Sequence, residues 1–289
     1  MFCRLTHVTR YEYGRSVFLE PHLIRLVPRG DAAQRLLSLD IAVDPLPAGR
    51  APVADAAGNA VLSAWFSGET GHLAVTVRAV VETLRDNPFD YLIEAGNARL
   101  PVPLAPAEAT LLAPYLAAKG GSWAATDAAA RQAGRDGGAT PQEFSMALLA
   151  WIYDRVKTVV RHEPGILSPD EVLARGEGAC RDLAAFFMAA CRLVGIPARF
   201  VSGYHEGDPE LGACDLHAWA EIFLPGGGWR GFDPSLGLAV ADRHIAVAAA
   251  ADPRDAAPIV GAFRGDGATP RLSHDIRLEL SDRPGQPFF

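Results

Sequence analysis

The sequence predicts an α+β protein in which a small antiparallel β-sandwich precedes a second unit of helices and antiparallel strands. Three observations lead to this prediction: period-two alternation within the first 85 residues, helix-capping motifs from residue 140, and a second group of strand patterns from residue 199. Segregated runs of strands and helices are typical of this fold class. We therefore expect a β-sandwich domain over residues 1–85, a linker with short helices over 86–139 and a core over 140–289.

Composition and charge exclude several classes of partner. The chain has 49% hydrophobic and 21% charged residues, which are globular values. Its net charge of −7 and scattered Lys and Arg predict no nucleic-acid or anionic-membrane partner. The first residues lack an apolar signal segment, and the longest apolar run, Leu183–Cys191, is too short to span a bilayer. We expect a cytoplasmic protein without membrane association, and nothing in the sequence indicates its oligomeric state.

Two stretches of the N-terminal third alternate as half-buried strands do. Apolar side chains occupy every second position from Leu37 to Val43 and again from Leu73 to Val81. Gly58-Asn59 and Gly68–Gly71 supply the turns between strands. In the segment that follows, the prolines from Pro101 to Pro114 and the glycine-rich run 134–138 interrupt any long element, so residues 86–139 are predicted as a linker with short helices.

Regular helix is predicted from residue 140. Thr140–Glu143 and Ser168–Glu171 are capping boxes with proline at the first helical position, and the second helix should stop at Gly176. A third helix is predicted from Cys180 to Val194, because Gly195 and a following proline prevent its continuation.

Cys180 is the first candidate for chemistry. It lies at the predicted start of the third helix, where free N–H groups and the helix dipole favour a thiolate and can hold an oxyanion. Taken alone, a Cys near a helix start is more often a plain structural residue. A nucleophilic Cys also needs a base and a group that orients the base.

His217 and Asp233 are the candidates for those two roles. His217 opens a predicted strand over residues 217–224, and Asp233 ends the next one, over 229–233. If these strands are neighbours, the two side chains share a face only if Leu224 lies opposite Gly228 across a three-residue loop over 225–227, or if a bulge shifts the register by one residue. The alternatives are a packed core His and a turn-forming Asp.

The remaining cysteines and any metal are weaker candidates. Cys191 falls on the apolar face of the third helix and is expected in the core, while Cys3 is uninformative. Cys214 and His217 have a ligand-like spacing, but no second ligand pair is near in sequence and no Cys-x-x-Cys occurs. We therefore predict neither a metal nor another cofactor.

Four segments, in this order and spacing, resemble motifs of bacterial transglutaminase-like proteins: Gly178–Asp182, Leu193–Tyr204, His217–Ile222 and Gly228–Ser235. Shorter segments elsewhere also resemble that family, namely Tyr11–Tyr13, His22–Pro28, Gly58-Asn59, Asn87–Tyr91 and His244–Ala248. The resemblance covers most of the chain. It implies a papain-like transglutaminase core behind a bacterial transglutaminase-like β domain, with Cys180, His217 and Asp233 as a catalytic triad.

Such a triad predicts attack on an amide carbonyl of a peptide or protein, with peptidase or amidase activity favoured over cross-linking. The alternative is a non-catalytic module that binds a peptide or another partner. The chain also departs from the family pattern: Leu183 and Ala185 stand where relatives often have Phe and His, and His162 stands where an aromatic is common. His162 is either an oxyanion donor or a loop residue.

Overall fold

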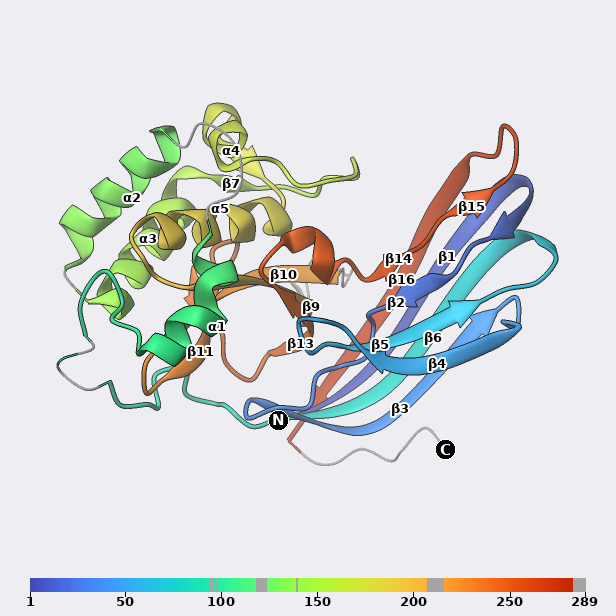
Figure 1. Cartoon of the computed structure of the whole chain (residues 1–289), viewed down its shortest axis with the longest axis horizontal. Coiled ribbons are helices and arrows are strands. Elements are labelled where there is room, and N and C mark those ends of the chain that lie inside the picture. The colour runs from blue at the N-terminus through green and yellow to red at the C-terminus, as the bar shows by residue number, and fades with distance from the viewer. Residues whose placement is uncertain (94–95, 97, 118–123, 139, 207–215, 283–289) are drawn as a thin grey trace.

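The computed structural model describes residues 1–93, 96, 98–117, 124–138, 140–206 and 216–282. The α+β class and the N-terminal sandwich are confirmed: an elongated pair of β-sheets lies beside a unit of helices on a third sheet (Figure 1). No helix of these residues is long and apolar enough to cross a membrane.

Two antiparallel sheets form the sandwich. The first has the order β15-β1-β6-β3, with β16 also paired to β1; its strands are β1 (Phe2–Leu19), β3 (Gln34–Asp44), β6 (Glu69–Thr83), β15 (Phe263–Arg264) and β16 (Pro270–Ser281). The second has the order β14-β2-β5-β4, with β2 (His22–Ile24), β4 (Gly49–Ala54), β5 (Ala60–Trp65) and β14 (Ile259–Val260). Side chains from both sheets share one apolar core.

The alternation read from the sequence holds in β6 and fails at one point in β3. Every second residue of β6 from Leu73 to Val81 is fully buried. Leu37, expected on the buried face of β3, is 45% exposed. A register shift between Leu36 and Ser38 puts Leu37 out of phase with Val43, because an extra residue in one strand turns the side chains beyond it to the other face.

The end of the chain returns to the sandwich. β16 pairs with β1 from Pro270 to Ser281, β15 pairs with the end of β1, and β14 pairs with β2. The domain boundaries predicted from the sequence place residues 140–289 in the core. That prediction does not include the pairing of the C-terminal strands with the sandwich, because their partner strands lie about 250 positions earlier in the chain, beyond the range of any local pattern.

In the described part of the core unit, α1, α3 and α5 pack on the antiparallel sheet β12-β11-β10-β9-β13, and α2 and α4 pack on these helices. The strands are β9 (Ala198–His205), β10 (Leu216–Leu224), β11 (Gly228–Asp233), β12 (Leu238–Ala239) and β13 (His244–Ala250). The helices are α1 (Pro106–Leu116), α2 (Ala124–Gly137), α3 (Pro141–Arg155), α4 (Pro169–Arg175) and α5 (Cys180–Leu193), and a short parallel ladder joins β7 (Lys157–Thr158) to β8 (Glu177–Gly178).

The three predicted helices form at the predicted starts, and α5 ends at Leu193, one residue before the predicted end. Thr140 and Ser168 cap α3 and α4 through complete capping boxes, and Gly176 ends α4 in the left-handed conformation. α5 is buried over every residue from Asp182 to Arg192, because the sheet lies on one side of it and α2, α3 and α4 lie on the others (Figure 1). The segment predicted as a linker contributes α2 to this same core.

The sandwich and the core meet along β13, the edge strand of the third sheet. The buried amide of Gln34 donates to the Ala246 carbonyl (2.9 Å) and accepts from its N–H (2.7 Å). Asn59 does the same at Ala249, with distances of 3.0 and 2.8 Å. Each side-chain amide thereby bonds the backbone N–H and C=O of one edge-strand residue, as a neighbouring strand would do.

Candidate active site

Cys180 is the first residue of α5 and is partly exposed. Its position follows from the local sequence: Gly176 ends α4, and only three residues separate it from Cys180. At Gly178 a Cβ atom would lie 2.8 Å from the Leu183 side chain, so a glycine lets the segment pass close over the helix. The N–H groups of Cys180 and Arg181, the first two residues of α5, have no intrahelical acceptor.

His217 and Asp233 lie on neighbouring strands in the predicted register. Leu224 is paired with Gly228 across a turn over residues 225–227, and Gly226 and Gly228 both have positive φ. The two side chains therefore share a face of the sheet, and His217 Nε2 donates to Asp233 Oδ2 at 2.6 Å. The register prediction is confirmed.

The electrostatics of this pair favour a charged His217. Burial alone would lower the His217 pKa, but its hydrogen bonds to Asp233 and to Cys180 raise the pKa to about 10. Burial alone would raise the pKa of Asp233, yet the hydrogen bonds from His217 and His244 hold that pKa well below its usual range. At neutral pH the imidazolium therefore lies between a carboxylate and the Cys180 sulfur.

The carboxylate of Asp233 is fully buried and tightly held. Its Oδ1 accepts from the Ser235 hydroxyl (2.6 Å), the Ser235 N–H (3.0 Å) and the Leu236 N–H (3.3 Å). An Asp followed two residues later by Ser is a turn signal, and the sequence interpretation had weighed that turn as an alternative to catalysis. In the structure the turn fixes Oδ1, the carboxylate oxygen that His217 does not use.

His244 is a site residue that the sequence interpretation missed. It opens β13, its side chain is 2% exposed, and its Nε2 lies 3.0 Å from the same Asp233 Oδ2 that accepts from His217. His205, opposite it on β9, completes a group of three imidazoles with ring centroids 4.6–5.8 Å apart. The only available signal was the resemblance of segment His244–Ala248, which does not indicate what the imidazole contacts.

A buried salt bridge supports the entrance to α5. The carboxylate of Asp182 accepts from Arg161 Nε (2.9 Å), from the Leu167 N–H (2.8 Å) and from the Ala179 N–H (2.9 Å). Arg181 donates to three carbonyls of the same loop, at residues 161, 163 and 165. His162 is exposed in this loop, and no polar contact of its side chain supports the oxyanion role considered for it.

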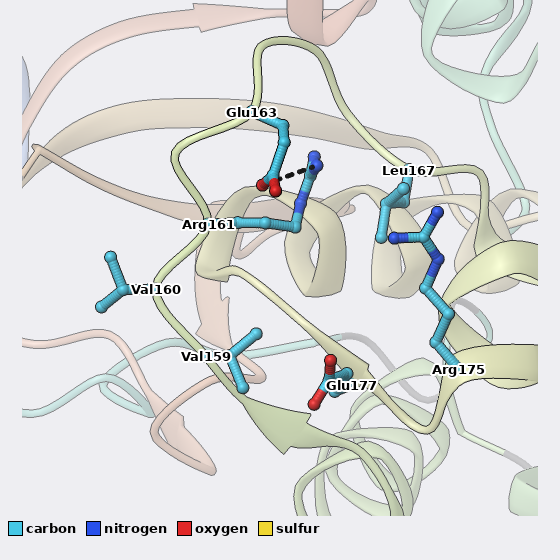
Figure 2. A pocket seen from close by; sticks show the side chains of 7 residues that line it. All are labelled: Val159, Val160, Arg161, Glu163, Leu167, Arg175 and Glu177. Atoms are coloured by element: carbon cyan, nitrogen blue, oxygen red, sulfur yellow. Dashed lines mark ion pairs between the residues drawn. The ribbon is translucent and has the colours of Figure 1, made fainter.

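A cavity of about 230 Å³ opens beside this loop (Figure 2). Its wall includes Val159, whose N–H donates to the Gly178 carbonyl at 3.0 Å, two residues before Cys180. Figure 2 shows Arg161 paired with Glu163 across the loop, with the Arg175 guanidinium directed toward Leu167. The cavity carries side chains of both charges and borders the chain segment that leads to the thiol.

The other thiols are placed differently from Cys180. Cys191 is fully buried in the core, as predicted, and Cys3 is buried between the sandwich and the third sheet. Burial raises the pKa of Cys3 to about 12, and that of Cys191 is raised for the same reason. Cys214, considered above as a metal ligand, lies outside the described residues.

Within the described part of the chain, one group has the spacing of metal ligands. One ligand atom each of His217, Asp233 and His244 lie within 4.8 Å of one another. This set differs from the pair of metal ligands considered from the sequence, Cys214 and His217. Its atoms hydrogen-bond to one another, and a protonated His217 competes with any cation for the same nitrogen.

Comparisons with known proteins agree with this architecture. A model of the transglutaminase-like superfamily matches residues 128–234, and one of the bacterial transglutaminase-like N-terminal region matches residues 3–82. An uncharacterized protein of Mycobacterium tuberculosis is 28% identical over 283 residues, covering 89% of this chain and 86% of the relative. An uncharacterized Mycobacterium leprae protein is 27% identical over 295 residues, covering 96% and 98%.

A solved structure has the same fold along the whole chain. It is the crystal structure of a candidate cysteine protease from Cytophaga hutchinsonii, similar with a TM-score of 0.67 at 19% sequence identity. The similarity covers 100% of this chain and 96% of that one. The sandwich and the core therefore occur together, in this arrangement, in another protein.

Proposed function

Because the chain carries a core of the transglutaminase-like superfamily behind a bacterial transglutaminase-like N-terminal region, we propose that it is a cysteine-dependent amide hydrolase or acyltransferase. The acyl group is carried as a thioester on Cys180. One observation carries the proposal: His217 hydrogen-bonds both Asp233 and Cys180, and the thiol stands at the N-terminus of a buried helix. That is the geometry of a nucleophile, a base and an orienting group.

The reaction follows from these positions. The Cys180 thiolate attacks the carbonyl carbon of an amide, a C–S bond forms, and the carbonyl π pair moves to the oxygen. The first-turn N–H groups of α5 stabilise that oxyanion. The tetrahedral intermediate collapses as the C–N bond breaks, and His217 gives its proton to the leaving amine.

Deacylation completes the cycle. Water attacks the thioester and gives a proton to His217, the C–S bond breaks, and the carboxylic acid leaves with the thiolate restored. An amine in place of water gives a new amide instead. We assign hydrolysis as the main outcome and a peptide or protein amide as the substrate, because nothing in the sequence marks a site for a second amine.

A trapping experiment tests this proposal. The protein is incubated with peptides prepared from a bacterial lysate and quenched in acid within seconds, and the Cys180 peptide is searched for acyl adducts by mass spectrometry. Adducts should form in wild type and in Cys191→Ala, whose thiol is buried, and should be absent in Cys180→Ala.

The alternative binding module makes the opposite prediction. It would retain intact peptides, form no adduct, and alkylate at Cys180 no faster than an ordinary thiol with a pKa near 8.5. That combination would reject the enzymatic proposal, whatever the fold.

A further inference from the structure

The carboxylate of Asp233 has two histidine partners on one oxygen. His217 Nε2 lies 2.6 Å and His244 Nε2 lies 3.0 Å from Asp233 Oδ2. A carboxylate can only accept, so His244 must carry its proton on Nε2. The three remaining contacts of Asp233 all fall on Oδ1 and come from the turn that follows it. Among the residues that the structure describes, His244 is therefore the one partner besides His217 that fixes Oδ2.

His244 makes this contact as a neutral ring. Burial lowers its pKa, and the charge of His217 lowers it further, although Asp233 opposes both effects. Its Nδ1 is buried without a hydrogen-bond partner among the described residues, which suits a bare lone pair better than a second N–H. The titratable groups around it are His205 on β9, His217 on β10 and Asp233 on β11, with Glu206 farther away. The pKa of His205 is lowered to about 4 by burial and by the two other rings, so the positive charge stays on His217.

The position of His244 depends on the sandwich. β13 is the edge strand of the third sheet, and its backbone is bound by the amides of Gln34 and Asn59, which are 3% and 1% exposed. The first of these contacts lies two residues from His244, at Ala246. Gln34 stands at the start of β3 and Asn59 precedes β5, so both sheets of the sandwich hold the strand that carries the imidazole.

We propose that His244 is a positioning residue that aligns Asp233 with His217, and that the N-terminal sandwich acts in the reaction by holding His244 in place. The proposal rests on the function proposed above. Without the second donor, Oδ2 is free to turn away from His217 within the small space beside the ring. The thiolate–imidazolium pair then loses part of its stabilisation, and a neutral thiol–imidazole pair becomes populated.

Alkylation of Cys180 by iodoacetamide tests this without a known substrate. The reagent reacts with the thiolate, forming a C–S bond and releasing iodide, and mass spectrometry of the Cys180 peptide separates it from the other thiols. At pH 6 an ordinary thiol with a pKa near 8.5 is less than about 1% ionised, so the rate there reports the ion pair. In wild type a second rise should follow near pH 10, where His217 loses its proton.

Two substitutions separate alignment from packing. His244→Leu removes the donor and keeps an apolar side chain, and His244→Gln places an amide N–H near the position of Nε2. The rate at pH 6 should fall about tenfold or more in His244→Leu, as is typical when such a supporting partner is lost, and the second rise should move to lower pH. His244→Gln should recover most of the rate. Urea unfolding of both variants establishes that they are folded.

The outcomes distinguish a failure of the positioning role of His244 from a failure of the proposed function at Cys180. If the wild-type rate at pH 6 does not depend on His217, as judged by His217→Ala, the proposed function fails. If that rate does depend on His217 while folded His244→Leu behaves as wild type, or while His244→Gln is as slow as His244→Leu, the role of His244 is refuted.

The role of the sandwich is tested with the same alkylation rate of Cys180 at pH 6. Gln34→Leu removes the two Gln34 contacts to Ala246 and leaves the Arg29 N–H bonded to the Ala246 carbonyl at 2.9 Å. It should lower the pH 6 rate in the same direction, by less than His244→Leu. Arg35→Leu, at an exposed neighbouring position of β3, serves as control and should leave the rate unchanged. Wild-type kinetics in folded Gln34→Leu would remove the sandwich from the mechanism.

Discussion

The buried salt bridge beneath Cys180 offers a quantitative test of how the site is held. The Asp182 side chain is fully buried and the Arg161 side chain is 13% exposed. Four hydrogen bonds end on this carboxylate: two from Arg161, at 2.9 and 3.4 Å, and one each from the N–H groups of Leu167 and Ala179. The Ala179 N–H belongs to the residue that precedes Cys180, so the pair fixes where α5 begins.

Asp182→Ala should be strongly destabilising. It leaves two backbone N–H groups without their acceptor, at about 1–3 kcal/mol each. It also leaves the Arg161 guanidinium with only the exposed carboxylate of Glu163, 3.7 Å away, and removal of one partner of a buried pair costs about 3–5 kcal/mol. Since these contributions overlap, we expect a loss of about 4–6 kcal/mol, a large share of the roughly 5–15 kcal/mol that stabilises a folded protein.

A double-mutant cycle isolates the pair. Asp182→Ala, Arg161→Ala and the double variant are unfolded in urea and followed by tryptophan fluorescence, with alkylation of Cys180 as a second readout. The double variant should lose about 2–3 kcal/mol less than the sum of the single losses, which is at the upper end for residues in direct contact. Losses that add to within about 0.5 kcal/mol would refute the argument that the two charges act as a unit.

Three further predictions concern the core, the charge of the site and the sheet. Cys191→Ala should lower the free energy of unfolding by about 1–2 kcal/mol, because it opens a small cavity in a packed core; an unchanged urea midpoint would contradict its burial. The His217 pKa is raised from 6.5 to about 10, so the stability that its proton contributes is complete below pH 6.5 and is lost as pH rises through about 10. Asp233→Asn should flatten that loss and move the second rise in Cys180 alkylation to lower pH, and a profile identical to wild type would take Asp233 out of the site. In Gly203→Ala the new Cβ would lie 2.1 Å from the Ile245 carbonyl oxygen, so we expect a loss of about 1–3 kcal/mol or more; Gly71→Ala, where nothing lies within 4 Å, is the control.

Local sequence determined the ends of elements and the pairing of adjacent ones. Thr140, Ser168 and Gly176 fix helix ends through hydrogen bonds that close within four residues, so their effect does not depend on the rest of the fold. The three-residue turn before Gly228 likewise fixes the register of β10 and β11. These short-range rules were sufficient to place Cys180 at a helix start. The register that brings His217 to the face of Asp233 was required by the triad hypothesis, and the glycines of the turn permit it.

Only the tertiary structure decided what surrounds those residues. His244 reaches Asp233 from β13, two strands beyond the one that carries His217, and β13 is itself held by Gln34, more than 200 residues earlier in the chain. No periodicity or capping rule relates such positions, because their contact depends on the docking of whole sheets and on apolar burial summed over many side chains. For the same reason the sequence located the candidate nucleophile and the candidate base, but not the second histidine or the return of the C-terminal strand to the sandwich.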